Sequence, residues 1–272
     1  MSAETSEPQA PVIVKLGGSV ITRKREVERV RPKVLARLAR EIAESGSERI
    51  VLLHGAGSFG HPGARRFGLA HAPDAGEDAR RRARGAAIVS AEVRRLHVTV
   101  LRALVAAGCS PISIPVATHA RNRSGELANL DAEPFKDALG RGLMPVSFGD
   151  VVPDESWNSS ILSADTIARA LAPVLHPRRV IFVSDVAGIL EGPTTGRRTV
   201  ASEVTDELAA SLRPPPGAPD VTGGIRGKAR AMRAIARAGS DAGLISGLSD
   251  GALLRAIRGE FVYGSWAYAE TG

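Results

Sequence analysis

Lysines beside glycine-rich turns are the residues of this sequence best suited to chemistry. Lys15 ends an apolar run and is followed closely by Gly17 and Gly18, and Lys228 follows Gly224 near the other end of the chain. A glycine turn lets backbone N–H groups approach an anion, and a helix that starts there adds its positive end. With a mobile lysine charge alongside, such turns predict a site that binds phosphates and transfers phosphoryl groups.

A third glycine turn follows the apolar run at 50–53 and carries a histidine. Its residues are Gly55, Ala56, Gly57, Gly60 and His61. The same glycine spacing occurs in dinucleotide-binding turns, but those require an acidic residue about twenty positions on, at the end of the next strand. Here that region lies inside a predicted helix, so we interpret the turn as an anion-binding turn of another fold. An imidazole beside it can donate a hydrogen bond to the anion and gain charge there.

The remaining histidines suggest no further site. His54 ends the apolar run before the third turn, and packing is the better interpretation of it. The others have no metal-ligand spacing, so no metal-binding residue is predicted: His71, His97, His119 and His176.

Two other motifs match known catalytic turns only in part. Residues 223–228 resemble a Walker A loop, but the glycine spacing is one residue short and Ala229 replaces the Ser or Thr that binds magnesium. Residues 247–251 match the nucleophile elbow of α/β hydrolases, yet no histidine follows them in the chain. Neither a P-loop fold nor a serine hydrolase is therefore predicted.

Two aspartates stand at the ends of predicted elements. Asp165 lies at the start of a helix predicted at 163–171. Its negative charge there either interacts favourably with the helix dipole or orients lysines. Asp185 follows the apolar run at 179–184, and open α/β sheets bind ligands at the carboxyl ends of their strands. An ordinary turn residue is the alternative interpretation of Asp185.

The elements that must position these residues alternate between strand and helix. Strands are predicted at 12–15, 50–53, 112–115, 144–148, 179–184 and 242–245. Helices are predicted at about 31–45, 77–107, 132–140, 163–171, 203–212, 226–238 and 250–258, and the polar segment 117–130 is given no strand. Such alternation is typical of a parallel sheet covered by helices on both faces. We therefore predict an α/β fold, a three-layer αβα sandwich with a mainly parallel central sheet.

Length and composition bound the architecture and the compartment. The 272 residues suffice for one large domain, which we expect at 12–272, with lobes at about 12–172 and 173–272 behind a disordered tail at 1–11. Cys109 is the only cysteine, so no intrachain disulfide forms, and no apolar run has transmembrane or signal-peptide character. We expect a cytoplasmic protein without membrane contact.

The net charge of +7 fits anionic partners in general. Because the arginines are scattered, apart from a dense run at 80–84, we interpret most of this charge as solvated helix faces. A basic nucleic-acid-binding protein is the alternative from a different class. The sequence contains few aromatic residues and no recognisable nucleic-acid-binding motif, which speaks against it.

Taken in chain order, these motifs resemble the amino acid kinase family over nearly all of residues 12–262. The series consists of 15–19, 55–60, Gly149-Asp150, Ala164-Asp165, 184–189 and 222–228. Each motif is weak alone, but six in this order are specific. Within the family, the turn ending in His61 and the run at 220–224 resemble members that act on isopentenyl phosphate. The resemblance implies transfer of the ATP γ-phosphoryl group to that substrate, with Mg²⁺ on the nucleotide's phosphates.

The resemblance also implies a role for each motif residue. Lys15 would bridge the donor and acceptor phosphates, Lys228 would contact the nucleotide, and Asp165 would hold both lysines. The predicted acceptor-binding residues are Gly55, Ala56, Gly57, Gly60, His61 and Gly149. The predicted ATP-binding residues are Lys15, Gly17, Gly18, Ser19, Lys24, Ser184, Asp185, Gly188, Gly223, Gly224 and Lys228. The helix at about 83–101 would form a wall for the isoprenoid tail.

Alternatives within the family stay open at this point. A kinase acting on a phosphonate such as fosfomycin would share His61, whereas a carboxylate acceptor fits less well because an imidazole suits a phosphate or phosphonate. The family resemblance also implies a homodimer. Since the acceptor oxygen of a phosphate is already ionised, the reaction needs alignment and charge neutralisation more than a general base.

Overall fold

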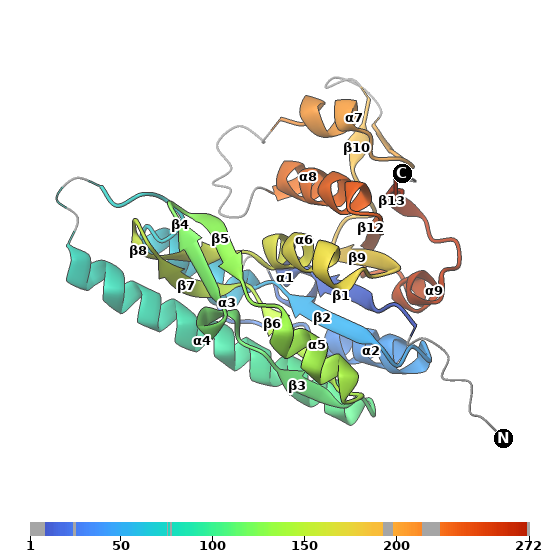
Figure 1. The fold of residues 1–272 in the computed structure, drawn as a ribbon, viewed down its shortest axis with the longest axis horizontal. Coiled ribbons are helices and arrows are strands. Elements are labelled where there is room, and N and C mark those ends of the chain that lie inside the picture. The colour runs from blue at the N-terminus through green and yellow to red at the C-terminus, as the bar shows by residue number, and fades with distance from the viewer. Residues whose placement is uncertain are drawn as a thin grey trace.

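The computed structural model describes residues 9–23, 26–74, 76, 78–192, 198–213 and 224–270, and it is built on a seven-stranded sheet. The strand order is β13-β12-β9-β1-β2-β6-β3 (Figure 1). The bounds are β1 (Val12–Leu16), β2 (Ile50–His54), β3 (Pro111–Ser113), β6 (Met144–Phe148), β9 (Arg179–Ser184), β12 (Asp241–Ser246) and β13 (Gly264–Ala267). Every neighbouring pair is parallel except β12 with β13.

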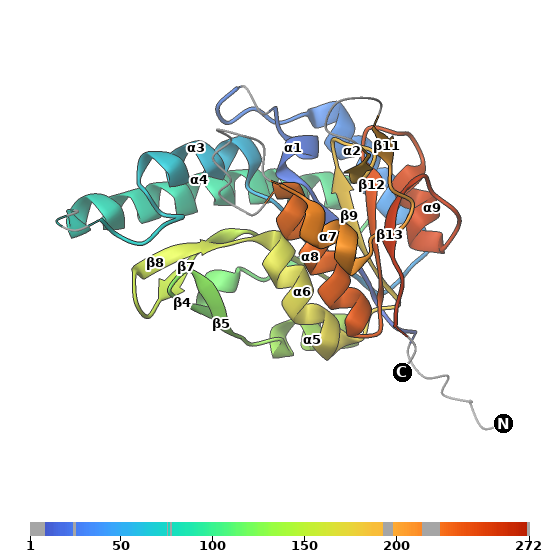
Figure 2. The ribbon, with the colours of Figure 1, turned by 90° about the horizontal axis from the view of Figure 1, so that it is seen from above.

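Helices cover both faces of this sheet (Figure 2). One face packs against α5 (Glu133–Gly140), α6 (Ala164–Leu175) and α8 (Gly224–Arg237), and the other against α2 (Pro32–Glu44), α4 (Ala79–Ala106) and α9 (Ala252–Arg258). Neighbouring strand residues alternate between the two cores, so Ile13 belongs to the first and Val12 and Val14 to the second. The predicted three-layer sandwich with a mainly parallel sheet is confirmed.

A second, four-stranded sheet was not predicted. Its order is β5-β4-β7-β8, with β4 (Ala120–Arg123), β5 (Glu126–Leu130), β7 (Asp150–Asp154) and β8 (Asn158–Leu162). The expectation of no strand at 117–130 was wrong. β4 alternates between buried and exposed residues and β5 is mostly exposed, so these short strands lack the apolar run that marks a buried strand. They are held by a hairpin and by pairing with β7, which lies farther along the chain.

Short elements complete the described chain: α1 (Gly18–Ile21), α3 (Gly57–Arg66), the 3₁₀ helix η1 (Val116–Thr118), α7 (Asp206–Ser211), β10 (Leu190–Glu191) and β11 (Thr199–Val200). The predicted tail falls mostly on residues 1–8, which lie outside the described residues. The predicted boundary between two lobes near residue 172 falls within α6 and stays a prediction.

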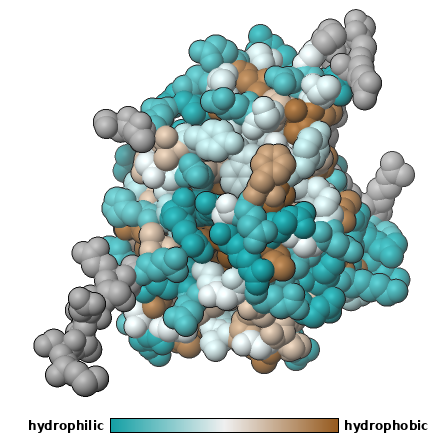
Figure 3. All heavy atoms as spheres, turned by 90° about the vertical axis from the view of Figure 1, so that its right-hand side faces the viewer, coloured by the Kyte–Doolittle hydropathy of each residue, from teal (hydrophilic) through white to brown (hydrophobic). Residues whose placement is uncertain are grey.

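The face at the right-hand side of Figure 1 is mostly hydrophilic, with apolar side chains in small separate groups (Figure 3). Within the described part of the chain, no helix combines the length and the apolar character needed to span a bilayer.

Candidate active site

Two glycine turns lie in direct backbone contact at the carboxyl ends of β1 and β2. A Cβ atom on Gly18 would lie 2.3 Å from the backbone nitrogen of Gly57, and one on Gly55 would lie 2.8 Å from the nitrogen of Gly18. Gly57 also has a φ of +52°, which favours glycine. The glycines therefore allow the backbone segments of the two turns to touch, in addition to any contact that they make with an anion.

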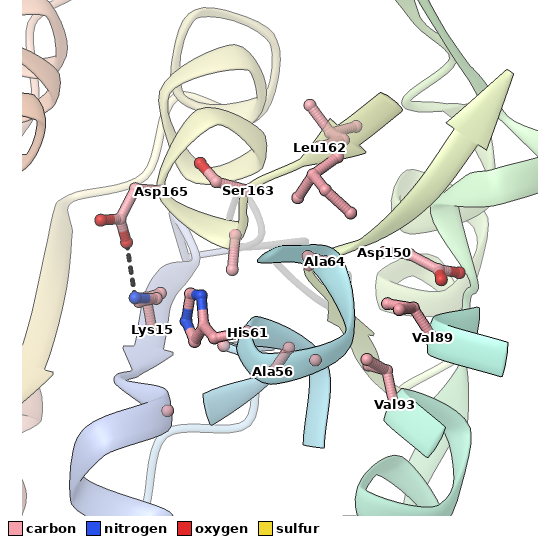
Figure 4. Close-up of a pocket in the computed structure, with 16 residues that line it drawn as sticks. Lys15, Ala56, His61, Ala64, Val89, Val93, Asp150, Leu162, Ser163 and Asp165 are labelled. Atoms are coloured by element: carbon pink, nitrogen blue, oxygen red, sulfur yellow. Dashed lines mark ion pairs between the residues drawn. The ribbon is translucent and has the colours of Figure 1, made fainter. Parts of the chain in front are cut away.

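Each of these turns opens a helix. α1 begins at Gly18 and α3 begins at Gly57, so two helix N-termini start at the same edge of the sheet. One turn into α3, the half-buried His61 lines the pocket described below, and its ring lies beside Lys15 (Figure 4). A run with three glycines and a proline among ten positions gives no helix signal in the sequence, so α3 was not predicted.

Three of the predicted site residues form one buried cluster. Lys15 comes from β1, Asp165 from the first turn of α6 and Lys228 from the start of α8. The Lys15 Nζ lies 2.6 Å from Asp165 Oδ1, and the Lys228 Nζ lies 2.6 Å from Oδ2 (Figure 4 shows the first pair). Each of the three side chains is at least 88% buried. A single carboxylate thus holds both ammonium groups in fixed positions.

The cluster carries one positive charge in excess when both lysines are protonated. Burial lowers the pKa of Lys15 to about 8, and nearby Lys228 adds to this effect while Asp165 opposes it. Burial alone would raise the pKa of Asp165, but the two ammonium groups outweigh it and hold the pKa of that carboxyl well below its usual range. The carboxylate is therefore ionised throughout the physiological range, and the surplus charge favours an anionic ligand.

A pocket opens beside this cluster. One end is polar and cationic, and it is lined by Lys15, Gly55, Gly60, His61 and Asp165. The other end is apolar, and it is lined by Ala64, Val89, Val93 and Ile161, which pack together. In Figure 4, Lys15 and Asp165 lie on one side of the pocket and Val89 and Val93 on the opposite side. The pocket suits a small ligand with an anionic head and a short apolar tail.

Asp150 also lines this pocket, near the apolar wall (Figure 4). Burial raises the pKa of its carboxyl, although Arg94 opposes the shift with its Nη2 3.0 Å from Oδ2. Gly149, which precedes it, donates its backbone N–H to the carbonyl of His54 at 3.0 Å. A Cβ atom on Gly149 would lie 3.1 Å from the nitrogen of Ala164, so this glycine permits a close approach of α6.

Several of the predicted ATP-binding residues lie where the turn after β1 meets the turn after β9. Ser19 donates its hydroxyl hydrogen bond to Asp185 Oδ1 at 2.6 Å, which ties the turn after β1 to the turn after β9. Gly17 donates its N–H to the carbonyl of Val183 at 2.7 Å, and Ser184 ends β9. Gly188 packs closely against Ser265. Two predicted residues, Lys24 and Gly223, lie outside the described residues, and Gly224 begins α8 with a φ of +45°.

The family model that matches this chain is that of the amino acid kinase family, over residues 10–245. The chain belongs to the amino acid kinase family. The match spans both glycine turns, the Lys15–Asp165–Lys228 cluster and the pocket.

Several curated members of the family are similar to this amino acid kinase over most of their length. The isopentenyl phosphate kinase of Methanothermobacter thermautotrophicus is 33% identical over 93% of this chain and 97% of its own. The enzyme of the same name from Thermoplasma acidophilum is 32% identical over 81% and 85%. A solved structure of an isopentenyl phosphate kinase superposes with a TM-score of 0.84 at 31% identity, covering 94% of this chain and 99% of that one.

Sequence reasoning missed one wall of the pocket of this kinase. Ile161, Leu162 and Ser163 line it, but β8 was not predicted, because two serines interrupt its apolar pattern. Val89 and Val93 belong to the helix expected to form a wall for the tail. Their spacing of four on a largely Ala- and Arg-containing helix was the available signal.

Proposed function

We propose that this kinase transfers the γ-phosphoryl group of ATP to isopentenyl phosphate, giving isopentenyl diphosphate and ADP. The observation that carries the proposal is the pocket whose cationic end, at Lys15 and His61, adjoins a short apolar end at Val89 and Val93. A phosphate head and a five-carbon tail match those two ends. The similarity to curated isopentenyl phosphate kinases over most of the chain supports the same substrate.

In the proposed reaction an oxygen of the acceptor phosphate attacks the γ-phosphorus of ATP. The bond from that phosphorus to the β,γ-bridging oxygen breaks, and ADP leaves with the electron pair. Lys15 lies between the two phosphates and neutralises the charge that they share, while Lys228 contacts the nucleotide and His61 donates to the acceptor. The attacking oxygen is already ionised, so the residues align reactants and stabilise charge and need not remove a proton.

The donor groups on this chain fit a Mg²⁺ ion that the nucleotide carries. Asp165 is engaged by two lysines, and Asp185 accepts a hydrogen bond from Ser19. Among the described residues, no group of three or more His, Cys, Asp or Glu side chains is placed to hold a metal. Mg²⁺ often binds chiefly through phosphate oxygens and water, where it neutralises charge on the nucleotide.

The other acceptors considered have weaker support. Relatives named acetylglutamate kinase, whose acceptor class would be a carboxylate, match only about a quarter of this chain. A phosphonate acceptor remains an outcome of the test. The test is an ADP-release assay over isopentenyl phosphate, dimethylallyl phosphate, fosfomycin and N-acetylglutamate. The proposal fails if isopentenyl phosphate gives no turnover, or if one of the last two is used more efficiently.

We also propose a cytoplasmic homodimer that has neither a nucleic-acid nor a membrane partner. The dimer rests on the family resemblance alone. The compartment and the absence of those partners rest on the single cysteine and on arginines that are scattered over the sequence.

The pKa of Lys15 predicts an upper limb in the pH profile. Below about pH 8 the buried amine is protonated and attracts the acceptor phosphate, and above it the charge is lost. We therefore expect kcat/KM for the acceptor, which reports the free enzyme, to decline above about pH 8. In Lys15→Arg the guanidinium does not titrate, so its residual activity should lack this decline. If kcat/KM declined identically in the wild type and in Lys15→Arg, the decline would come from the titration of another group.

We expect the apolar end of the pocket to control how tightly the tail of the substrate binds. Val89→Ala removes two methyl groups from the pocket, so we expect KM for isopentenyl phosphate to rise about tenfold. The KM for ATP should stay unchanged, and longer alkyl phosphates should gain relative to isopentenyl phosphate. Val105→Ala is the matched control, because Val105 lies on the same helix with 62% of its surface exposed. An equal effect of the two changes would remove Val89 from the substrate site.

A further inference from the structure

Two buried histidines that the mechanism does not use form a chain of hydrogen bonds behind the third glycine turn. His54 ends β2 and His97 lies on α4, and their exposed fractions are 0% and 4%. The His54 Nε2 lies 3.1 Å from the His97 Nδ1, and the His97 Nε2 lies 2.7 Å from the Ser113 Oγ. At the other end, the His54 Nδ1 lies 3.2 Å from the carbonyl oxygen of Gly55.

The chemistry of the two ends fixes the direction of this chain. A carbonyl oxygen only accepts, so the Nδ1 of His54 carries the hydrogen and donates it to Gly55. In a neutral ring the Nε2 of His54 is then an acceptor, so the Nδ1 of His97 must be the donor between the rings. The Nε2 of His97 is left as an acceptor, and the Ser113 hydroxyl donates to it.

The surroundings keep both rings neutral. Phe148 lies against the two imidazoles, with ring centroids 5.4 Å from His54 and 4.3 Å from His97. Burial lowers the pKa of His54 to about 3, and the pKa of His97 to about 4 with help from the charge of Arg94. A proton added to His54 would place two N–H groups face to face at the 3.1 Å contact, and one added to His97 would lie on Nε2, opposite the Ser113 hydroxyl that donates to it. Only one pair of neutral tautomers satisfies all three hydrogen bonds.

The chain ends at the backbone that would hold the acceptor phosphate. Gly55 lines the pocket, and its backbone lies against Gly18 in the facing turn. We propose that His54 and His97, both as Nδ1–H tautomers, are positioning residues that fix the Gly55 carbonyl and so orient this turn toward the acceptor. The role of the turn rests on the proposed function, whereas the tautomers rest on the hydrogen bonds alone.

The tautomers can be read directly by ¹⁵N NMR on the intact enzyme without substrate. We expect both rings to be neutral at pH 7 with hydrogen on Nδ1, whereas the Nε2–H form is the usual one for a free imidazole. Single His54→Gln and His97→Asn variants assign the two signals. An Nε2–H tautomer or a charged ring at either position would overturn the proposal.

Kinetics test the positioning role. The amide nitrogen of Asn can take the place of Nδ1, so His97→Asn can still donate to His54, whereas His97→Phe keeps a ring and cannot. We expect His97→Phe to raise KM for isopentenyl phosphate roughly fivefold to tenfold with KM for ATP unchanged, and His97→Asn to recover most of the loss. Equal effects of the two variants, or a loss confined to stability, would overturn the role. If the wild type does not use isopentenyl phosphate at all, the proposed function fails and the tautomer result still stands.

Discussion

Lys15→Ala is expected to lower kcat by about two orders of magnitude or more and to leave the protein folded. A preorganised charge that meets the charge of a transition state typically contributes about 3–4 kcal/mol. The fold should survive because Asp165 keeps its 2.6 Å contact with Lys228, which leaves a balanced pair instead of an unpaired buried charge. Lys228→Ala should behave similarly, since Asp165 then retains Lys15.

The measurement is single-turnover and steady-state kinetics with circular dichroism on the same samples. Lys136→Ala is the matched control, because Lys136 lies on the exposed side of α5 and pairs there with Glu133. We expect this control to match the wild type. If folded Lys15→Ala also turned over at nearly the wild-type rate, Lys15 would have no part in the chemistry.

His61→Ala is expected to reduce kcat/KM for isopentenyl phosphate roughly tenfold to a hundredfold, since a hydrogen bond to a charged group contributes about 1.5–3 kcal/mol. The KM for ATP should hardly change, because His61 lies on α3 beside Gly60, on the acceptor side of Lys15. His61→Gln should recover part of the loss, because an amide still donates.

The matched control for this histidine is His71→Ala. The side chain of His71 is exposed, and its hydrogen bonds with Gly68 and Arg82 are made by backbone atoms, which the substitution preserves. If His61→Ala instead raised KM for ATP and left the acceptor kinetics intact, the two substrates would occupy the opposite ends from those proposed.

Most strands of the central sheet could be predicted because they are buried on both faces, but the antiparallel edge strand β13 was not predicted. Runs such as Val12–Leu16 and Ile50–His54 are apolar along nearly their whole length, which gives a signal that depends on no partner. β4 and β5 gave no such signal, since they are short and only partly buried, and β4 pairs with β7, a strand from a later part of the chain. Because the second sheet was not predicted, the pocket wall formed by Ile161 and Leu162 was not predicted either.

The residues of the site were predicted more completely than their contacts. Glycine and lysine near strand ends indicate phosphate chemistry through local sequence alone. No spacing rule, however, connects Lys15 with Asp165 and Lys228, which come from three separate elements. Their meeting was expected only from the family resemblance. The histidine chain was missed because the sequence does not show which residues lie next to a buried histidine. A histidine that only packs in the core and one that belongs to a hydrogen-bonded chain therefore look the same in the sequence.

The contact between Gly18 and Gly57 has a consequence for how specificity can change. Main-chain atoms of the two turns touch, with no room for even one added carbon atom, so neither turn can shift toward the other. If the donor and the acceptor bind as proposed, the backbone of these turns sets the distance between them. Val89, Val93 and Ile161 lie apart from these turns, at the far end of the pocket. Substrate range can therefore be redesigned in those side chains while the reacting distance stays constant.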